Sequence, residues 1–291
     1  MSISTISKGN VTVGAQRRRL NWERYLLWVV LGFGTILMIG PFYWMFITSF
    51  KPREEILLFP PTWWPQQPTV ENYYLNQLRV GSFPIFFRNS LFVAITITLL
   101  TLFTSALAGY LFAKHQFKGR DLIFLAVLSM LVIPFNISII PLYALIVDLN
   151  WNNTYWALII PSAFSPFGIF LMRQFMHTIP TELIDAARID GASEFGIFFR
   201  IILPLSTAPL AALGIFTFIM QWDDFLWPLV IIDDPALYTL PLGLSQLRGR
   251  FGTVIGQLAA ASTMTVLPVL IVYILAQRRF IEGITLTGLK G

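Results

Sequence analysis

Two adjacent acids, Asp223 and Asp224, interrupt one of the long apolar stretches of this sequence, and Trp222 and Trp227 flank them. An acid inside a bilayer is costly, so it usually marks a path for a solute or an ion. The cost falls toward the surface, and we favour a position in water at the outer end of a span for this pair. The tryptophans fit either a pathway or an interfacial aromatic belt. The four residues together are a possible pathway or outer gate.

Other groups that commonly carry out catalysis are scarce. The chain has no cysteine, which excludes disulfides, thiolate metal sites and cysteine nucleophiles. Its two histidines, His115 and His177, show no metal-ligand spacing, and we interpret both as solvated. No phosphate-binding loop of the Gly-x-x-x-x-Gly-Lys-Ser/Thr type is present, so the chain cannot hydrolyse ATP itself. We therefore predict no catalytic residue, no metal site and no bound cofactor.

The composition indicates a membrane protein. Hydrophobic residues make up 56% of the 291 residues and charged residues only 12%, and 26 residues are phenylalanine. A soluble fold with so few charges would expose a large apolar surface, whereas a bilayer allows apolar side chains to face outward. In a membrane protein the positions of Lys and Arg along the chain matter more than the net charge, which is +5 here. We therefore expect no nucleic-acid partner.

Six apolar stretches are long enough to cross a hydrocarbon core, which takes about 17–25 residues. They are 25–50, 89–113, 122–147, 155–172, 204–232 and 256–277. We predict an all-α polytopic membrane protein with a six-helix domain over 25–277 between tails at 1–24 and 278–291. The third and fourth stretches contain Pro134, Pro141, Pro161 and Pro166, which we interpret as packing kinks, with a gating hinge as the alternative.

Basic residues set the orientation. With the N-terminus inside, 14 of the 20 Lys and Arg residues fall in inside segments and 6 in outside segments. This excess agrees with the positive-inside rule and predicts that both termini are cytoplasmic. The long outer loop, 51–88, is rich in Pro, Trp and Tyr, and we expect it to carry a short interfacial segment.

The long inner loop, about 177–204, predicts two short helices. Thr181 can cap the first, with Glu182 in its first turn, and Gly191 ends it because glycine accepts left-handed geometry. Ser193 can cap the second helix, in which four apolar residues recur at helical spacing, and these form one predicted face: Phe195, Phe198, Phe199 and Ile202. From these patterns alone, a surface for docking a partner and a solvated hairpin are about equally favoured.

The inner loop resembles the signature loop of binding-protein-dependent ABC importer permeases. That pattern is Glu-Ala-Ala, three residues, Gly, nine residues, then Ile-x-Leu-Pro. Here the corresponding residues, with Asp in place of Glu, are Asp185, Ala186, Ala187, Gly191, Ile201, Leu203 and Pro204. The resemblance implies a coupling helix seated in a cleft of an ATP-binding subunit. We expect Glu182 and Asp185 to make charged contacts there and Ala187 and Gly191 to permit close docking, and we include Asp190 in the same coupling loop.

Three further segments are similar to the sugar-importer branch of that family: 222–229 (WDDFLWPL), 239–244 (TLPLGL) and 277–291. The resemblance implies the smaller, six-span permease of a heterodimer that imports an oligosaccharide, a polyol or a glycerol-phosphate ester through the inner membrane. It also implies a second, different permease, an extracytoplasmic binding protein, and two ATP-binding subunits that hold ATP and Mg. In such a system Trp222 and Trp227 could stack on a sugar ring.

Two other classes of protein stay open. A secondary transporter driven by an ion gradient should show inverted repeats and acids near mid-membrane, and neither is clear in this sequence. An intramembrane enzyme should carry a cluster of His, Asp or Arg at one interface, and Asp223 with Asp224 is the one hint of it.

Overall fold

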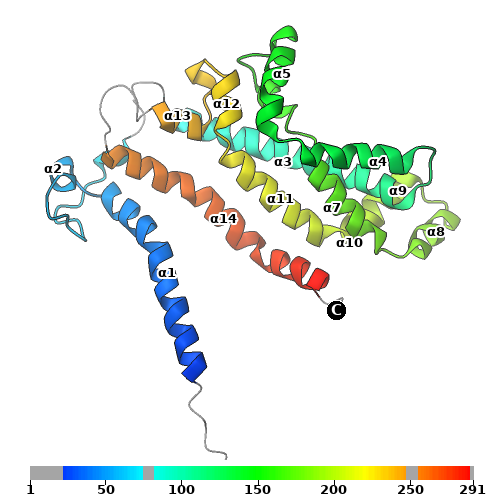
Figure 1. Cartoon of the computed structure of the whole chain (residues 1–291), viewed down its shortest axis with the longest axis horizontal. Helices are drawn as coiled ribbons and strands as arrows, with labels where there is room; N and C mark the ends of the chain where they lie inside the picture. Colours follow the sequence, from blue (N-terminus) through cyan, green and yellow to red (C-terminus); the bar gives the residue numbers. More distant parts are fainter. Residues whose placement is uncertain (1–21, 75–81, 247–254, 289–291) are drawn as a thin grey trace, which may run out of the picture. The chain divides into compact units, whose positions relative to one another are not determined.

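The structure, a computed structural model, describes residues 22–74, 82–246 and 255–288, and every regular element in these ranges is a helix (Figure 1). The chain divides into two units, 1–44 and 45–291. The described part of the first unit belongs to one helix, α1 (Trp22–Ser49). Its apolar portion, Arg24–Ser49, has 26 residues, and at 1.5 Å per residue it is about 39 Å long, enough to cross a bilayer.

In the second unit two helices are long and apolar enough to span a membrane by themselves: α3 (Phe83–Lys114) and α14 (Ile255–Gly288), the latter over Ile255–Leu275. Two further candidates are bent pairs. In the first, α4 (Arg120–Ser129) and the 3-10 turn η2 (Met130–Val132) meet α5 (Phe135–Asp148) at 105°. Pro134 stands at that bend, so the predicted kink is a sharp corner.

In the second bent pair, a chain of short helical segments meets α11 (Thr207–Trp222) at 78°. These segments are α9 (Glu194–Ile197), the π-helical turn η3 (Phe198–Ile202) and α10 (Leu203–Leu205). The fourth predicted stretch is divided into α6 (Tyr155–Ile159) and α7 (Pro166–His177), each too short to span alone. The described residues thus contain three spanning helices, or five if each bent pair is one span, and the count of six stays a prediction.

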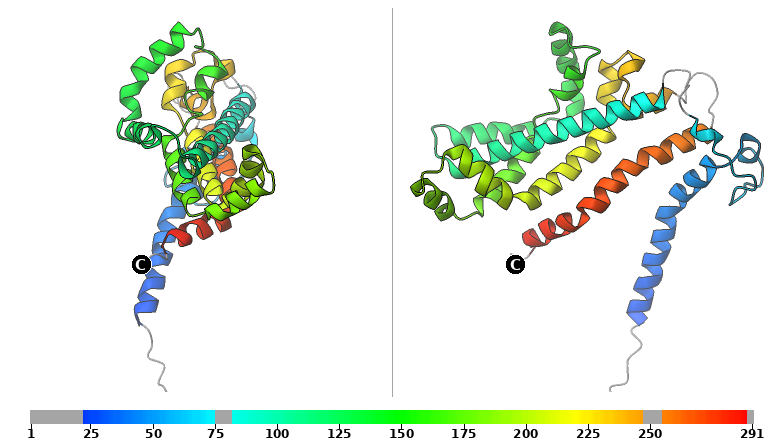
Figure 2. Two further views of the ribbon diagram at one scale, coloured as in Figure 1. Left: turned by 90° about the vertical axis from the view of Figure 1, so that its right-hand side faces the viewer. Right: turned by 180° about the vertical axis from the view of Figure 1, so that it is seen from behind.

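The long helices of the second unit lie side by side, with α3 packed against α7 and α11, and α11 against α14 (Figure 2). Small residues bring α3 and α7 close together. A Cβ on Gly109 would lie 2.6 Å from the Met172 Cβ and 2.9 Å from the Arg173 backbone nitrogen. A Cβ on Gly168 would lie 2.3 Å from the Ser105 Oγ. Such small residues allow membrane helices to approach closely and gain van der Waals contact.

The segment after α1 folds around a buried carboxylate. Glu55, in α2 (Arg53–Ile56), accepts hydrogen bonds from the Thr62 hydroxyl at 2.6 Å and from the Gln66 backbone N–H at 3.0 Å. Burial by itself would raise the pKa of Glu55, but these hydrogen bonds, with one from Gln67 and the charge of Lys51, leave that pKa lowered. Because this segment, 50–74, falls mostly in the loop predicted to lie outside, we call it the outer cap.

The outer cap ends in the 3-10 turn η1 (Glu71–Tyr73), which packs against the start of α14. Two contacts of the Asn72 amide close it, to the backbone oxygens of Ser49 (3.0 Å) and Lys51 (2.8 Å). Large side chains on its surface are exposed, among them Phe59, Trp63 and Trp64. The interfacial segment predicted in the loop 51–88 agrees with these exposed rings, but its depth in a bilayer stays a prediction.

Candidate functional site

The loop predicted to lie inside contains the two predicted helices, α8 (Thr181–Ile189) and the shorter α9. Gly191 ends the first helix with φ of 80°, and the Ser193 Oγ accepts a hydrogen bond from the Gly196 N–H at 3.2 Å. The predicted helix end at Gly191 and the predicted cap at Ser193 are both confirmed. Thr181 is the first residue of α8 rather than its cap. Pro180 holds the cap position and makes no side-chain hydrogen bond there.

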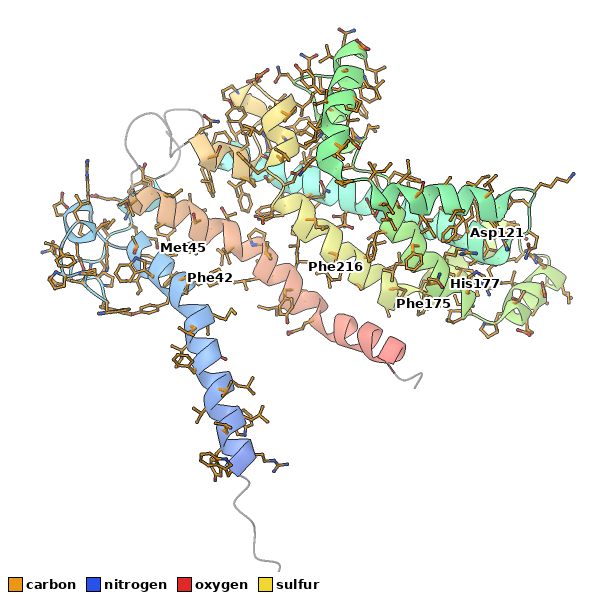
Figure 3. All side chains as sticks on the ribbon, in the orientation of Figure 1. Phe42, Met45, Asp121, Phe175, His177 and Phe216 are labelled. Carbon is orange, nitrogen blue, oxygen red and sulfur yellow. The ribbon has the colours of Figure 1, made fainter. Side chains whose placement is uncertain are left out.

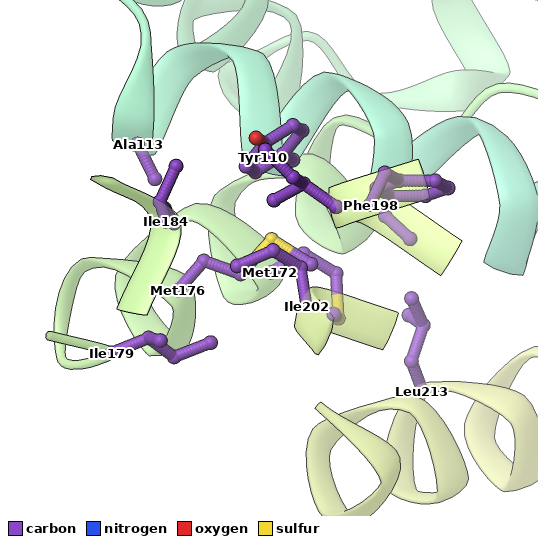
Figure 4. Close-up of a cluster of buried hydrophobic side chains, with 11 residues drawn as sticks. Tyr110, Ala113, Met172, Met176, Ile179, Ile184, Phe198, Ile202 and Leu213 are labelled. Atoms are coloured by element: carbon purple, nitrogen blue, oxygen red, sulfur yellow. The ribbon is translucent and has the colours of Figure 1, made fainter. Parts of the chain in front are cut away.

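One face of α8 is anchored in a buried core (Figure 4). The Ile184 side chain is fully buried, and Ala187 packs beside it. The core also contains Tyr110 of α3, Met172 of α7 and Leu213 of α11. Ile201 and Leu203 of the signature pattern pack against the same core, whereas Pro204 is exposed in α10. A movement of α8 would therefore displace side chains that pack on α3, α7 and α11.

The opposite face of α8 is exposed and carries the predicted docking residues. Glu182, Asp185 and Ala186 all lie on it, and Asp190 and Gly191 continue it at the helix end. Sequence reasoning missed two apolar residues on this surface, Leu183 and Ile189, the second of which is 86% exposed. Their signal was the helical spacing of 182, 185 and 189 and of 183, 186 and 190, which form stripes on the side away from Ile184. Small, acidic and apolar side chains together suit a protein contact.

A group of polar side chains holds α8 against α3. The Glu194 carboxylate accepts a hydrogen bond from the Arg188 Nε at 2.7 Å and one from the Tyr110 hydroxyl at 3.1 Å. Its second oxygen also lies 3.1 Å from the His115 Nε2. The interpretation of His115 as solvated was wrong, because this ring also meets the Tyr110 ring edge-on at 4.9 Å. The hydrogen bond to Glu194 raises the pKa of Arg188, so the guanidinium stays protonated.

The residues that are buried in and after the second helix are not the four residues of the predicted apolar face. Phe198 and Ile202 are buried, but Phe195 is 70% exposed and Phe199 is half-exposed. Ile197, which the prediction left out, is fully buried instead. From Phe198 to Ile202 the chain forms a π-helical turn, which is wider than an α-helical turn, so the α-helical spacing used for the prediction no longer holds across the segment.

His177 and Asp121 lie at the same end of the unit as α8 and α9 (Figure 3). The Asp121 Oδ1 accepts from Arg120 at 3.0 Å and lies 3.7 Å from Arg173, whose guanidinium lies over the Phe124 ring. His177 is exposed, as the sequence predicted. No group of three or more His, Asp or Glu residues gathers as metal ligands within 22–74, 82–246 and 255–288.

The second candidate group lies at the other end of α11. Trp222 is buried and donates its indole N–H to the Thr265 backbone oxygen of α14 at 3.1 Å. Trp227, in α12 (Leu226–Ile231), is buried and donates to the Ala157 backbone oxygen of α6 at 2.8 Å. Both rings are thus internal anchors, and neither presents a free face to a solute or to lipid in this structure.

The two acids of this group differ. Asp224 is half-buried and lies just before the first turn of α12, where the backbone N–H groups of Leu226 and Trp227 face its carboxylate. Asp223 is exposed and lines a pocket together with Phe225, which precedes α12, and with residues of α13 (Leu240–Gln246) and α14. Of the four residues predicted as a pathway or gate, Asp223 alone faces an open space of this kind among the described pockets.

Apolar helices of spanning length around an exposed loop with the complete signature spacing define a permease subunit of a binding-protein-dependent transporter. The chain matches the model of the family described as binding-protein-dependent transport system inner membrane component over residues 102–284, and it belongs to that family. Subunits of this kind are multi-pass inner-membrane transport components rather than enzymes, and they work with other subunits of a transport system.

Curated relatives align over almost the whole chain. The arabinooligosaccharides transport system permease protein of Halalkalibacterium halodurans is 39% identical over 278 residues, covering 94% of this chain and 97% of the relative. The lactose transport system permease protein of Rhizobium radiobacter is 33% identical over 267 residues, covering 92% and 96%. A chain in the crystal structure of a bacterial ABC transporter that imports the acidic polysaccharide alginate has the same fold, with a TM-score of 0.80 at 20% identity, covering 89% of this chain and 96% of that chain.

Proposed function

We propose that this chain is one of two different permease subunits of an ATP-driven importer for a sugar or sugar-like solute, and that it forms half of the translocation pathway. The names of the relatives, which refer to arabinooligosaccharides and to lactose, support the solute class. In this proposal both termini are cytoplasmic, and an extracytoplasmic binding protein delivers the solute to the outer side. Two separate ATP-binding subunits bind ATP and Mg.

The observation that carries the proposal is the exposed face of α8. It presents Asp185 and Ala186, the start of the family pattern, on a helix whose other face is fixed in the core by Ile184. A cleft of an ATP-binding subunit would receive Ala186, bury Ile189, and meet the charges of Glu182, Asp185 and Asp190. Burying an apolar side chain such as Ile189 contributes about 1.5–3 kcal/mol.

The mechanism is alternating access driven by that contact. When the ATP-binding subunits close on ATP, they move α8 as a rigid body. The core under Ile184 passes the displacement to α3, α7 and α11 because closely packed side chains transmit strain instead of absorbing it. Because α11 packs on α14, the last span moves with it. The loop thus acts mechanically, and no residue of this chain takes part in ATP chemistry.

The first test is affinity purification of the chain in mild detergent, with the genes of the transport system co-expressed, followed by an ATPase assay with added binding protein. We expect a second permease, an ATP-binding subunit and stimulated hydrolysis. Ala186→Glu should reduce that stimulation at least about tenfold, since an unpaired charge in a closed cleft costs more than 1.4 kcal/mol. The control, Gln116→Glu, adds an acid at another exposed cytoplasmic position and should behave as wild type.

A chain that purifies alone, without ATPase activity, would contradict the proposal. In that case the exposed face of α8 has no protein partner, and a secondary transporter becomes the better interpretation. Equal behaviour of Ala186→Glu and Gln116→Glu in an active complex would leave the importer in place but remove α8 as its coupling element.

A further inference from the structure

The pocket that Asp223 lines has a volume of about 510 Å³, within the range of about 300–1,000 Å³ that small-molecule sites occupy. Three segments that lie near one another in the sequence supply its wall: the junction of α11 and α12, then α13, then the first turns of α14. Its polar groups are the Asp223 carboxylate and the hydroxyls of Ser245 and Ser262. Its apolar wall includes Phe225, Leu244 and Leu258.

The polar groups are available to a ligand. The Asp223 carboxylate makes no hydrogen bond or ion pair with any residue that the structure describes. Ser262 likewise has no hydroxyl partner there, although its neighbour Thr263 bonds back to Ala259 at 2.8 Å. Ser245 donates its proton to the Leu242 backbone oxygen at 2.7 Å and keeps its lone pairs for an incoming donor.

The walls of the pocket are fixed by buried hydrogen bonds. Trp222, next to Asp223, is bonded to the Thr265 oxygen, one turn along α14 from Ser262, and stacks on Phe218 at 5.8 Å. On the α13 side, the backbone N–H of Leu240 donates to the Ser90 hydroxyl of α3 at 2.7 Å. A site whose walls are set in advance loses little entropy when a ligand binds.

This combination selects a chemical class. Carboxylate and hydroxyl oxygens that lack donors are suited to the many O–H groups of a polyol or sugar, each of which can donate a hydrogen bond. A ring such as Phe225, which is 38% exposed, offers an apolar face to the C–H side of a sugar ring. An anionic solute would meet the like charge of Asp223, and like charges placed together in a binding site disfavour the wrong partner.

We infer that this chain contacts the transported solute directly, through a site formed by Asp223, Phe225, Ser245 and Ser262 that accepts neutral polyhydroxylated solutes and disfavours anionic ones. The inference rests on the proposed function and adds to it a contact between this subunit and the solute. It also separates neutral saccharides and polyols from phosphate esters and uronic acids among the possible cargoes.

The absence of cysteine from the chain makes a clean test possible. Ser262→Cys is introduced into the complete transporter in proteoliposomes, and the rate at which a small thiol reagent modifies this chain is measured with the binding protein present. The probes are arabinotriose, lactose, glycerol 3-phosphate and galacturonate, and the one that most stimulates ATP hydrolysis is used at ten times its half-saturating concentration. We expect the probe that most stimulates hydrolysis to be a neutral one. Its occupancy of the pocket should slow modification of the Ser262→Cys thiol about tenfold. Asn152→Cys, exposed in another outer loop, is the control and should react at one rate throughout.

A second variant keeps the inference falsifiable if Ser262→Cys is not assembled. Asp223→Asn should raise the half-saturating solute concentration for uptake about tenfold, because hydrogen bonds to a charged acceptor are worth more than those to an amide. Two results would overturn the inference and leave the importer in place. One is that the solute changes neither the reactivity of Ser262→Cys nor, in Asp223→Asn, the half-saturating concentration for uptake. The other is that an anionic probe gives the strongest stimulation. If no probe stimulates hydrolysis in the wild-type complex, it is the proposed sugar import that fails.

Discussion

At the scale of single residues, Glu194 is the side chain that connects the signature loop to the rest of the subunit. Its two oxygens contact Arg188 of α8 and both Tyr110 and His115 at the end of α3. Three side chains from two separate segments thus converge on one carboxylate. Because Arg188 and Glu194 are each about half exposed, we assign them a role in the position of α8 rather than a large share of stability.

Glu194→Gln should therefore weaken coupling more than folding. The amide loses the charge that holds Arg188, so α8 moves more freely against α3, and part of the motion from the ATPase is lost. We expect the complex to assemble, its unfolding free energy to change by about 1 kcal/mol or less, and fewer solute molecules to enter per ATP hydrolysed. The measurement is the ratio of uptake to hydrolysis in proteoliposomes.

Asp121→Asn is the matched control for Glu194→Gln. It removes an exposed carboxylate at the same end of the unit, but one whose partners, Arg120 and Arg173, lie outside α8. Its transport ratio should equal that of the wild type. If the two variants give the same ratio, the contacts of Glu194 do not position the loop.

Gly191 shows how far a residue can be predicted from sequence. Its place at the end of the first loop helix was predicted from the spacing, and its φ of 80° confirms it. A Cβ added to Gly191 would have open space within this chain. The intrachain cost is therefore backbone strain of about 1–2 kcal/mol. Any clash would have to come from the docked partner.

At the scale of elements, Gly→Ala substitutions should have opposite effects on stability at two helix contacts. One contact is the crossing of α3 and α7, and the other is the packing of α3 on α11. Gly109→Ala would push a Cβ against the backbone of Met172 and Arg173, at 2.9–3.0 Å. Gly214→Ala would place its Cβ 3.4 Å from the flexible end of Leu102. We expect Gly109→Ala to destabilise by about 1–3 kcal/mol and Gly214→Ala to stabilise by about 0.5–1 kcal/mol. Thermal unfolding in detergent measures both, and shifts of equal sign would refute the close crossing.

The outer cap predicts a dependence on pH. The pKa of Glu55 is lowered from its ordinary value of 4.5, so its contribution to stability is complete above 4.5 and is lost as the pH falls below that value. Glu55→Gln should lower the unfolding temperature near neutral pH, where the carboxylate holds Thr62 and Gln66. Between about pH 7 and about pH 3.5 the difference between wild type and variant should shrink. A difference that is constant over this range would show that the carboxylate does not hold the cap.

Element types followed well from composition and spacing, whereas bends and burial did not. The helical class and the two loop helices were predictable because apolar runs, caps and glycines act over a few residues. Kinks at the prolines were predicted, but the 105° corner at Pro134 and the π-helical turn at Phe198–Ile202 were not. The burial of Trp222 and Trp227 was missed because their partners, Thr265 and Ala157, are 43 and 70 residues away.

At the scale of the whole molecule, the second unit places two different surfaces at its two ends. One is the exposed face of α8, over a core shared by α3, α7 and α11. The other is the pocket at the junction of α11, α13 and α14. Because α11 runs from the core to the pocket, a displacement of α8 that tilts α11 would change the shape of the pocket. The proposed importer needs this link between the site of ATP binding and the path of the solute.

The central claim is that α8 docks into an ATP-binding subunit, and site-directed cross-linking tests it most directly. Ala186→Cys supplies a single thiol in a chain without cysteine, and a short bifunctional reagent that joins this thiol to a nearby amine is added to the assembled transporter. We predict one major product, which joins this chain to the ATP-binding subunit, and no such product from Gln116→Cys. If Ala186→Cys stays unlinked in a complex that hydrolyses ATP in response to the binding protein, α8 is not the coupling helix.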